Sequence, residues 1–154
     1  MEVKAGYRQT EVGIPEGWDT PNLGNLFSFK NGLNKGKAFF GYGTPIVNYM
    51  DVYGKRGIFL RDLRGRGCLS REEIKAFNVR KGDVFFTRTS ETADEVGIAS
   101  VMLDEPVDTV FSGFVLRARP KDNTLDNQFK KYCFSTESIR RQIVSQTTET
   151  THAR

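Results

Sequence analysis

The chain has 154 residues, of which 38% are hydrophobic, and its 23 Lys and Arg residues against 19 Asp and Glu give a formal net charge of +4. This length suffices for one core that buries roughly two thirds of the surface of the unfolded chain. The positive charge is compatible with a polyanionic partner. No apolar run approaches the roughly 18 to 20 residues of a membrane span, and Cys68 and Cys133 lack zinc or redox spacing. We therefore expect a soluble cytoplasmic protein that does not bind membranes.

The first third of the chain predicts few regular elements. Residues 1–13 are polar without a period, so an extended or frayed lead-in is expected. The apolar segment 23–29 fits either one helical turn or a strand. Residues 31–43 are rich in Gly and Lys, which predicts a long loop that either only connects two elements or lies along a nucleic-acid backbone. A nucleotide-binding loop is disfavoured because the GxxxxGK[ST] pattern is absent. The candidate contacts in this loop are Lys35, Lys37 and Tyr42.

Residues 45–52 predict a strand that begins at Pro45, where a missing N–H is tolerated, and that Gly54 ends. The window 55–66 is the most basic part of the chain, and only Asp62 opposes its cations. Basic runs usually form solvated faces. Arg outnumbers Lys here, however, and the planar guanidinium suits bidentate contacts to phosphate or guanine. Both interpretations remain open for Lys55, Arg56, Arg61, Arg64 and Arg66.

The stretch 81–90 combines a predicted core strand with a polar tip. A Gly-Asp turn precedes residues 84–86, whose β-branched and aromatic side chains suit a strand packed on both faces. The four residues that follow all offer hydrogen-bond donors, and Arg88 adds a fixed positive charge. The candidate contacts at this tip are Arg88, Thr89 and Ser90. The alternative is an ordinary turn in which Arg88 pairs internally with Glu91 or Asp94.

The remaining elements follow from local patterns. A capping box of Ser70 and Glu73 predicts a short helix that continues through Ile74 and Phe77. Further strands are predicted at 96–103 and 110–119, on either side of an acidic segment that contains a proline. Apolar residues at helical spacing predict two short helices near the end of the sequence, at 126–134 and 138–144.

No motif indicates catalysis. The only histidine, His152, has no Ser or Cys in a nucleophile setting, so we expect it at the surface or facing a phosphate. Residues 2–4 and 73–75 spell the E-x-K fragment of some nucleases, but the second fragment lies in the predicted capped helix. The glycine-rich residues 39–43 lack the acidic ribose partner of a cofactor loop. The sequence predicts no catalytic residue, no metal and no cofactor.

A set of short motifs, in this order and at this spacing, resembles the target-recognition domain of the DNA specificity subunit of type I restriction-modification enzymes. Its strongest part is the K-G-D-V-x-x-x-R-x-S pattern. The motifs that carry the resemblance are Ile14–Trp18, Leu23–Leu26, Thr44–Val47 with Asp51 and Val52, Lys81–Ser90 and Thr151–Arg154.

The resemblance implies an α/β domain of the α+β type, with a mixed, mainly antiparallel curved β-sheet, a few short helices on one side and recognition loops on the other. It implies one target-recognition domain over residues 1–154, whose polar tail at 146–154 would lead into a helical spacer. Such a domain reads one half of a bipartite double-stranded DNA target. Its partners are modification (methyltransferase) subunits and, through them, a restriction motor subunit, and the chemistry belongs to those partners.

Two other classes of function remain open from the residues alone. A module for single-stranded nucleic acid or RNA would expose aromatic side chains for base stacking, whereas most Phe residues here alternate with aliphatic ones and suggest a core. A protein-interaction domain would use its basic face on an acidic protein. The candidate DNA-binding residues under the favoured interpretation are Lys35, Lys37, Tyr42, Lys55, Arg56, Arg61, Arg64, Arg66, Arg88, Thr89, Ser90 and His152.

Overall fold

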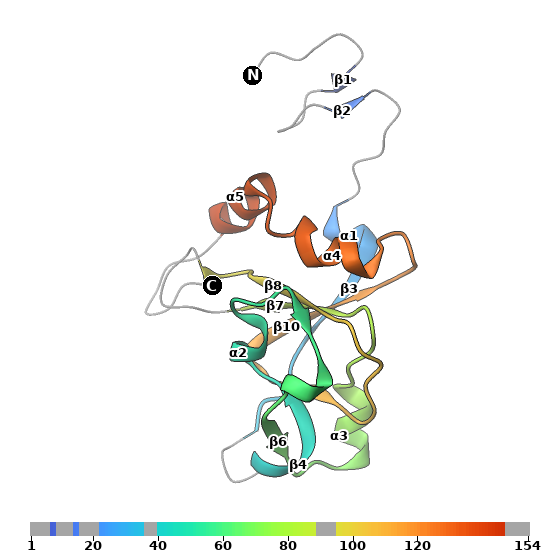
Figure 1. Ribbon diagram of the computed structural model, residues 1–154, viewed down its shortest axis with the longest axis vertical. Coiled ribbons are helices and arrows are strands. Elements are labelled where there is room, and N and C mark those ends of the chain that lie inside the picture. Colours follow the sequence, from blue (N-terminus) through green and yellow to red (C-terminus); the bar gives the residue numbers. More distant parts are fainter. Residues whose placement is uncertain (1–6, 9–13, 16–21, 36–39, 89–94, 147–154) are drawn as a thin grey trace.

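The computed structural model describes residues 7–8, 14–15, 22–35, 40–88 and 95–146, which form a mixed α+β fold (Figure 1). Its strands form a five-stranded sheet, a three-stranded sheet and the short pair β1 (Tyr7–Arg8) and β2 (Ile14–Pro15). Most of the pairings are antiparallel. The predicted fold class is therefore confirmed, although the strands divide between two main sheets where a single curved sheet was expected.

The larger sheet has the order β3-β10-β7-β8-β5, and only its β5–β8 pair is parallel. Strand β7 lies at its centre, and all four of its residues are buried, which the sequence predicted for residues 84–86. The ambiguous segment 23–29 contains both candidate structures, a helical turn and then a strand. The elements are α1 (Leu23–Leu26), β3 (Phe27–Asn31), β10 (Val115–Pro120), β7 (Val84–Thr87), β8 (Ala99–Met102) and β5 (Gly57–Ile58).

The smaller sheet has the order β6-β4-β9 and corrects two predictions. Its strands are β6 (Gly65–Gly67), β4 (Phe40–Val47) and β9 (Val110–Phe111). Strand β4 begins at Phe40, inside the predicted loop 31–43. It ends at Val47, five residues before the end of the predicted strand 45–52. A short helix follows, α2 (Tyr49–Val52). It forms because the Asp51 carboxylate accepts a hydrogen bond from the Asn48 N–H at 2.8 Å, a local cap that favours a helical turn over an extended chain.

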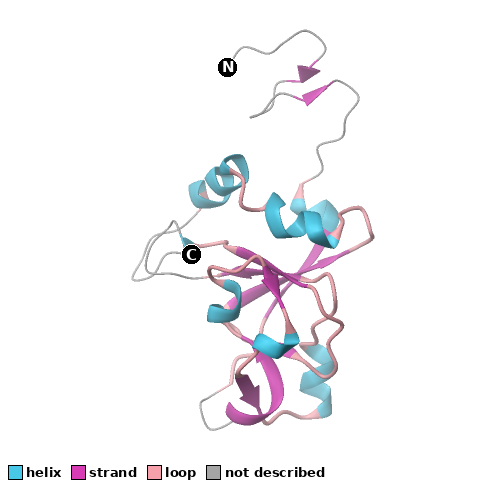
Figure 2. Cartoon of the chain, viewed as in Figure 1, coloured by secondary structure: helices cyan, strands magenta, loops and turns pink. Residues whose placement is uncertain are grey.

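The other predicted helices are present. The Ser70 hydroxyl accepts from the Glu73 N–H at 3.1 Å, and the Glu73 carboxylate accepts from the Ser70 N–H at 3.0 Å, so the predicted capping box is confirmed. Helices α1, α4 and α5 lie at one side of the larger sheet, and α3 lies near the smaller one (Figures 1 and 2). The helices are α3 (Arg71–Ala76), α4 (Asn127–Cys133) and α5 (Glu137–Ser145), with the 3-10 turn η2 (Leu60–Asp62) before β6.

The core lies on both faces of β7. Successive residues of a strand point to opposite faces, so Val84 and Phe86 join one apolar cluster while Phe85 joins another. The Phe86 ring meets Phe134 edge-on with centroids 5.1 Å apart, and the Phe85 ring lies 5.5 Å from that of Phe111. These contacts hold β7 rigidly, and β7 carries Arg88 at its end. Within the described part of the chain, no helix is long and apolar enough to cross a membrane.

The two cysteines provide a test of this packing. Both are free thiols; Cys68 is exposed, whereas Cys133 is half-buried on α4. Burial raises the pKa of the Cys133 thiol to about 11, and only the thiolate is a good nucleophile. At pH about 8, iodoacetamide is therefore expected to label Cys68 well before Cys133 in the folded protein, as followed by peptide mass spectrometry. Equal labelling rates in the native state would contradict this packing.

Candidate nucleic-acid interface

A groove with a volume of about 850 Å³ opens where the two sheets adjoin. Its walls come from the end of β3 and the segment after it, the start of β4, the residue before α2, the segment around β6, the end of β7 and the turn between β9 and β10. Six separate parts of the sequence thus contribute to one concave surface. The lining residues are Asn31, Gly32, Leu33, Asn34, Lys35, Gly41, Asn48, Arg64, Gly65, Arg66, Arg88, Ser112, Gly113 and Phe114.

Close backbone contacts hold the floor of the groove. The Leu33 N–H donates to the Phe111 carbonyl at 2.9 Å, and the Gly113 N–H donates to the Leu33 carbonyl at 2.8 Å. This approach requires a glycine at position 32, because a Cβ there would lie 2.0 Å from the Ser112 carbonyl oxygen. The segment after β3 is therefore fixed against the turn between β9 and β10.

Four of the predicted DNA-binding residues line the groove: Lys35, Arg64, Arg66 and Arg88. Backbone carbonyls hold two of them without neutralising their charge, since Arg64 Nη1 donates to the Arg61 carbonyl at 2.8 Å and Arg66 Nη1 donates to the Gly65 carbonyl at 3.0 Å. Lys35 instead forms an ion pair with Glu73 at 2.9 Å. The lining residues in the described ranges include no carboxylate, so the groove is positively charged.

Arg88 reaches across the end of the groove from β7. Its Nη1 donates to the Gly113 carbonyl at 3.2 Å, which connects the exposed guanidinium to the β9–β10 turn. The alternative pairing with Glu91 or Asp94 falls outside the described residues. Thr87, the first residue of the predicted polar tip, is buried instead, and its hydroxyl donates to the Glu95 carbonyl at 2.7 Å. The polar surface therefore begins one residue later than the sequence suggested.

The sequence did not indicate which uncharged residues line the groove. The sequence predicts one strand over residues 110–119. In the structure, Ser112 to Phe114 form a turn that divides this segment into β9 and β10. The Ser-Gly dipeptide within this turn was an available signal. The Phe114 side chain is 66% exposed at the groove. The amide side chains that line the groove are Asn31, Asn34 and Asn48.

Four other predicted residues lie away from the groove. The Arg61 guanidinium stacks over the Phe59 ring at 4.7 Å, on η2. Lys55 and Arg56 line a smaller pocket of about 200 Å³. Tyr42 is 69% exposed on β4, next to the groove residue Gly41 but not among those that line the groove. The remaining candidates lie outside the described residues: Lys37, Thr89, Ser90 and His152.

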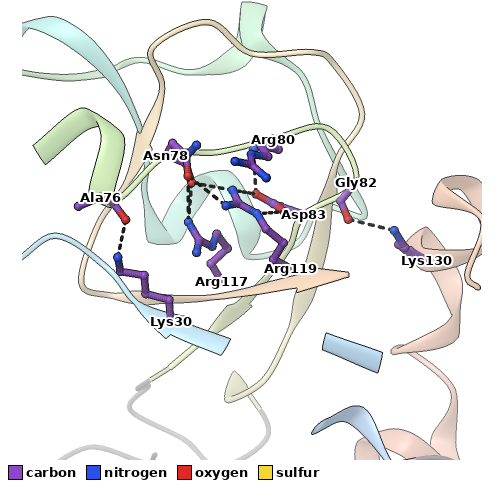
Figure 3. Close-up of polar contacts among 9 residues, drawn as sticks. All are labelled: Lys30, Ala76, Asn78, Arg80, Gly82, Asp83, Arg117, Arg119 and Lys130. Carbon is purple, nitrogen blue, oxygen red and sulfur yellow. Dashed lines mark hydrogen bonds and ion pairs between the residues drawn. The ribbon is translucent and has the colours of Figure 1, made fainter. Parts of the chain in front are cut away.

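A polar network fixes the start of β7 (Figure 3). The Asp83 carboxylate, 1% exposed, accepts from Arg119 Nε at 3.0 Å and from Nη2 at 2.8 Å. The Asn78 carbonyl accepts from Arg119 and from Arg117, and burial lowers the pKa of the Arg117 guanidinium. Lys130 on α4 donates to the Gly82 carbonyl at 3.1 Å, and burial likewise lowers the pKa of this lysine. This network joins β7, β10 and α4 at the end of β7 that is opposite Arg88.

No protein-family model matches the chain, and no curated protein matches it significantly. Solved structures, in contrast, match the chain over most of its length. The crystal structure of the HsdS subunit from Thermoanaerobacter tengcongensis has a TM-score of 0.54 at 16% identity, over 91% of this chain and 38% of that one. The type I restriction-modification system S subunit from M. genitalium has a TM-score of 0.51 at 18% identity, over 87% of this chain and 30% of that one.

These matches confirm, at the level of the fold, the resemblance inferred from the sequence motifs: the chain shares its fold with part of type I restriction-modification specificity subunits. The chain spans only about a third of the length of these structures, 38% of the first and 30% of the second.

Proposed function

We propose that this chain binds double-stranded DNA sequence-specifically and reads one half of a bipartite target for a type I restriction-modification complex. The observation that carries the proposal is the groove itself. Three arginines converge on it from distant parts of the sequence, beside Lys35, which pairs with Glu73, and its described lining residues include no carboxylate. A surface of this kind favours a polyanion, because each cation that meets a phosphate also releases counterions.

The groove also offers groups that can distinguish bases. An Arg guanidinium pairs bidentately with guanine O6 and N7, and an Asn amide pairs with adenine N6 and N7. Arg88 and Asn48 are held on the end of a buried strand and the start of a capped helix, so they lose little freedom on binding. We infer that such rigidly mounted groups read base edges while the other cations contact phosphates.

The chain's role in the complex is recognition without chemistry. Modification subunits, and through them a restriction motor subunit, would supply methylation and cleavage. In such a complex, the chain would bring the partner enzymes to one half-site of the DNA target. The proposal includes a cytoplasmic location, where the DNA and these partners meet.

A module for single strands is the second candidate, because Phe114 and Tyr42 expose their rings at and beside the groove. Two exposed rings are a weak stacking platform compared with a groove that holds four cations. The other large Phe side chains of β7 and β9 are buried in the core, which favours the duplex.

A salt titration separates these candidates. The purified chain is expected to bind a duplex more tightly than the matching single strand or an acidic polypeptide, measured by fluorescence anisotropy. Log Kobs should fall linearly with log salt, with a slope of about −0.9 for each phosphate neutralised. Equal or tighter binding to the single strand would contradict the proposal. So would an affinity for the duplex that does not change with ionic strength.

A further inference from the structure

A second cluster of positive side chains lies outside the groove. Arg56 comes from the segment between α2 and β5, whereas Lys131 and Arg140 come from α4 and α5. They line a pocket of about 200 Å³ together with Lys55, and no carboxylate is among its described lining residues. Sequence reasoning selected Lys55 and Arg56 only as members of a basic window and gave no reason to join them to residues about 75 positions later.

Two of these cations contact the ring of Tyr132. The Arg56 guanidinium lies 5.0 Å from the centroid of the Tyr132 ring, and the Lys131 ammonium lies 5.5 Å from it. Cation–π contacts position both charges but do not neutralise them. Lys55 differs from these two residues because its charge already interacts with the nearby Asp51 carboxylate. This interaction lowers the pKa of Asp51, although the larger effect of burial raises it. The case for an anion site therefore rests on Arg56 and Lys131.

This pocket adjoins the groove. Arg88 lines the groove, and the preceding residue, Thr87, donates its N–H to the carbonyl of Ile98 at 2.9 Å; Ile98 lines the pocket. Helix α2 makes a second connection, since Asn48 before it lines the groove and Gly54 after it lines the pocket. Asn48 and Gly54 are therefore only six positions apart in the sequence, on either side of one helical turn.

We propose that Arg56 and Lys131, with Lys55 and Arg140, form a second phosphate-binding site that holds the DNA backbone beyond the recognition groove. The inference rests on the proposed function and extends it. A duplex carries one negative charge per about 1.7 Å of its axis. DNA that binds in the groove therefore presents further phosphates to the cationic pocket that adjoins it. The pocket binds backbone phosphates and contributes affinity, whereas the groove supplies sequence preference.

The test compares Arg56→Ala, Lys131→Ala and the parent chain on a selected target duplex and on random duplex across a range of salt. Each variant is expected to reduce the magnitude of the salt slope by about 0.9, which corresponds to roughly eightfold weaker binding at about 0.1 M salt. The loss should be equal on both duplexes, so that the preference for the target is unchanged. Arg56→Lys should keep the parental slope, because it keeps the charge.

Arg141→Ala is the matched control, since Arg141 is an exposed arginine of α5 that pairs with Glu137 at 3.0 Å and does not line the pocket. Parental slopes in both Arg56→Ala and Lys131→Ala would overturn the second site while leaving the groove intact. So would variants that keep DNA binding but lose binding to an acidic polypeptide, since the pocket would then serve a protein. A parent chain that binds no duplex would overturn the proposed function together with this site.

Discussion

Asp83→Ala is expected to lower the free energy of unfolding by about 3 to 5 kcal/mol, the range for removal of one partner from a buried ion pair. Asp83 is 1% exposed and accepts two hydrogen bonds from Arg119, at 3.0 and 2.8 Å, and one from the Arg80 N–H at 2.8 Å. The alanine leaves the Arg119 guanidinium beside Arg117 without a counter-ion. Urea denaturation followed by circular dichroism measures the loss.

A double-mutant cycle separates the ion pair from the rest of the site. Arg119→Ala should cost much less in the Asp83→Ala background than in the parent, because its partner is already absent. Glu137→Ala provides the control, since it breaks the exposed pair with Arg141 and should cost about 1 kcal/mol or less. Additive costs for Asp83 and Arg119 would refute this account of the network in Figure 3.

Gly32→Ala is expected to destabilise the protein by about 1 to 3 kcal/mol, as overpacking in a well-packed region does. The new Cβ would lie 2.0 Å from the carbonyl oxygen of Ser112 and 2.4 Å from its carbonyl carbon, and backbone atoms cannot move away cheaply. The same substitution should loosen the floor of the groove and weaken duplex binding. Thermal denaturation and anisotropy on one preparation measure both effects.

Gly24→Ala is the matched control for this prediction. Gly24 lies in α1, where the nearest atom to a new Cβ is Oδ1 of the Asn22 side chain at 3.3 Å, well beyond the separation at Gly32. Alanine also favours a helix more than glycine does, by about 1 kcal/mol. A Gly32→Ala protein as stable as the parent would show that the segment after β3 does not approach Ser112 as closely as described.

The sequence predicted those parts of the fold that depend on local patterns. The apolar run 84–86 identified the central strand because a strand buried on both faces needs β-branched and aromatic residues throughout. The Ser70 and Glu73 capping box identified α3 because both of its hydrogen bonds join residues three positions apart. Such signals operate within one turn of chain and do not depend on the tertiary structure.

The predictions failed where a local cap competed with an apolar pattern. Residues 45–52 favour a strand by composition, yet the Asp51 carboxylate caps Asn48 and turns the chain into α2. This correction matters for function, because the turn separates Asn48 in the groove from Gly54 in the second pocket. An Asn followed three residues later by Asp was the available signal.

The candidate site could be predicted only in part. Individual cations were chosen from basic windows, but their convergence depends on pairings between distant segments, such as that of β7 with β10. The sequence therefore placed Lys35, Arg64, Arg66 and Arg88 in the same list as Arg61, which the structure separates from the groove. Asp83 was read only as a turn residue, because its partner Arg119 lies 36 positions away.

The most direct test of the proposed DNA interface is the binding of Arg88→Ala to a duplex selected from a random pool and to random duplex. Arg88 directly follows β7, a strand that is buried along its whole length, and its guanidinium donates a hydrogen bond to the Gly113 backbone carbonyl. If Arg88 reads a base, the substitution should cost about 1 to 3 kcal/mol on the selected duplex and much less on random DNA. A variant of parental stability that binds both duplexes as well as the parent does would contradict the proposed interface.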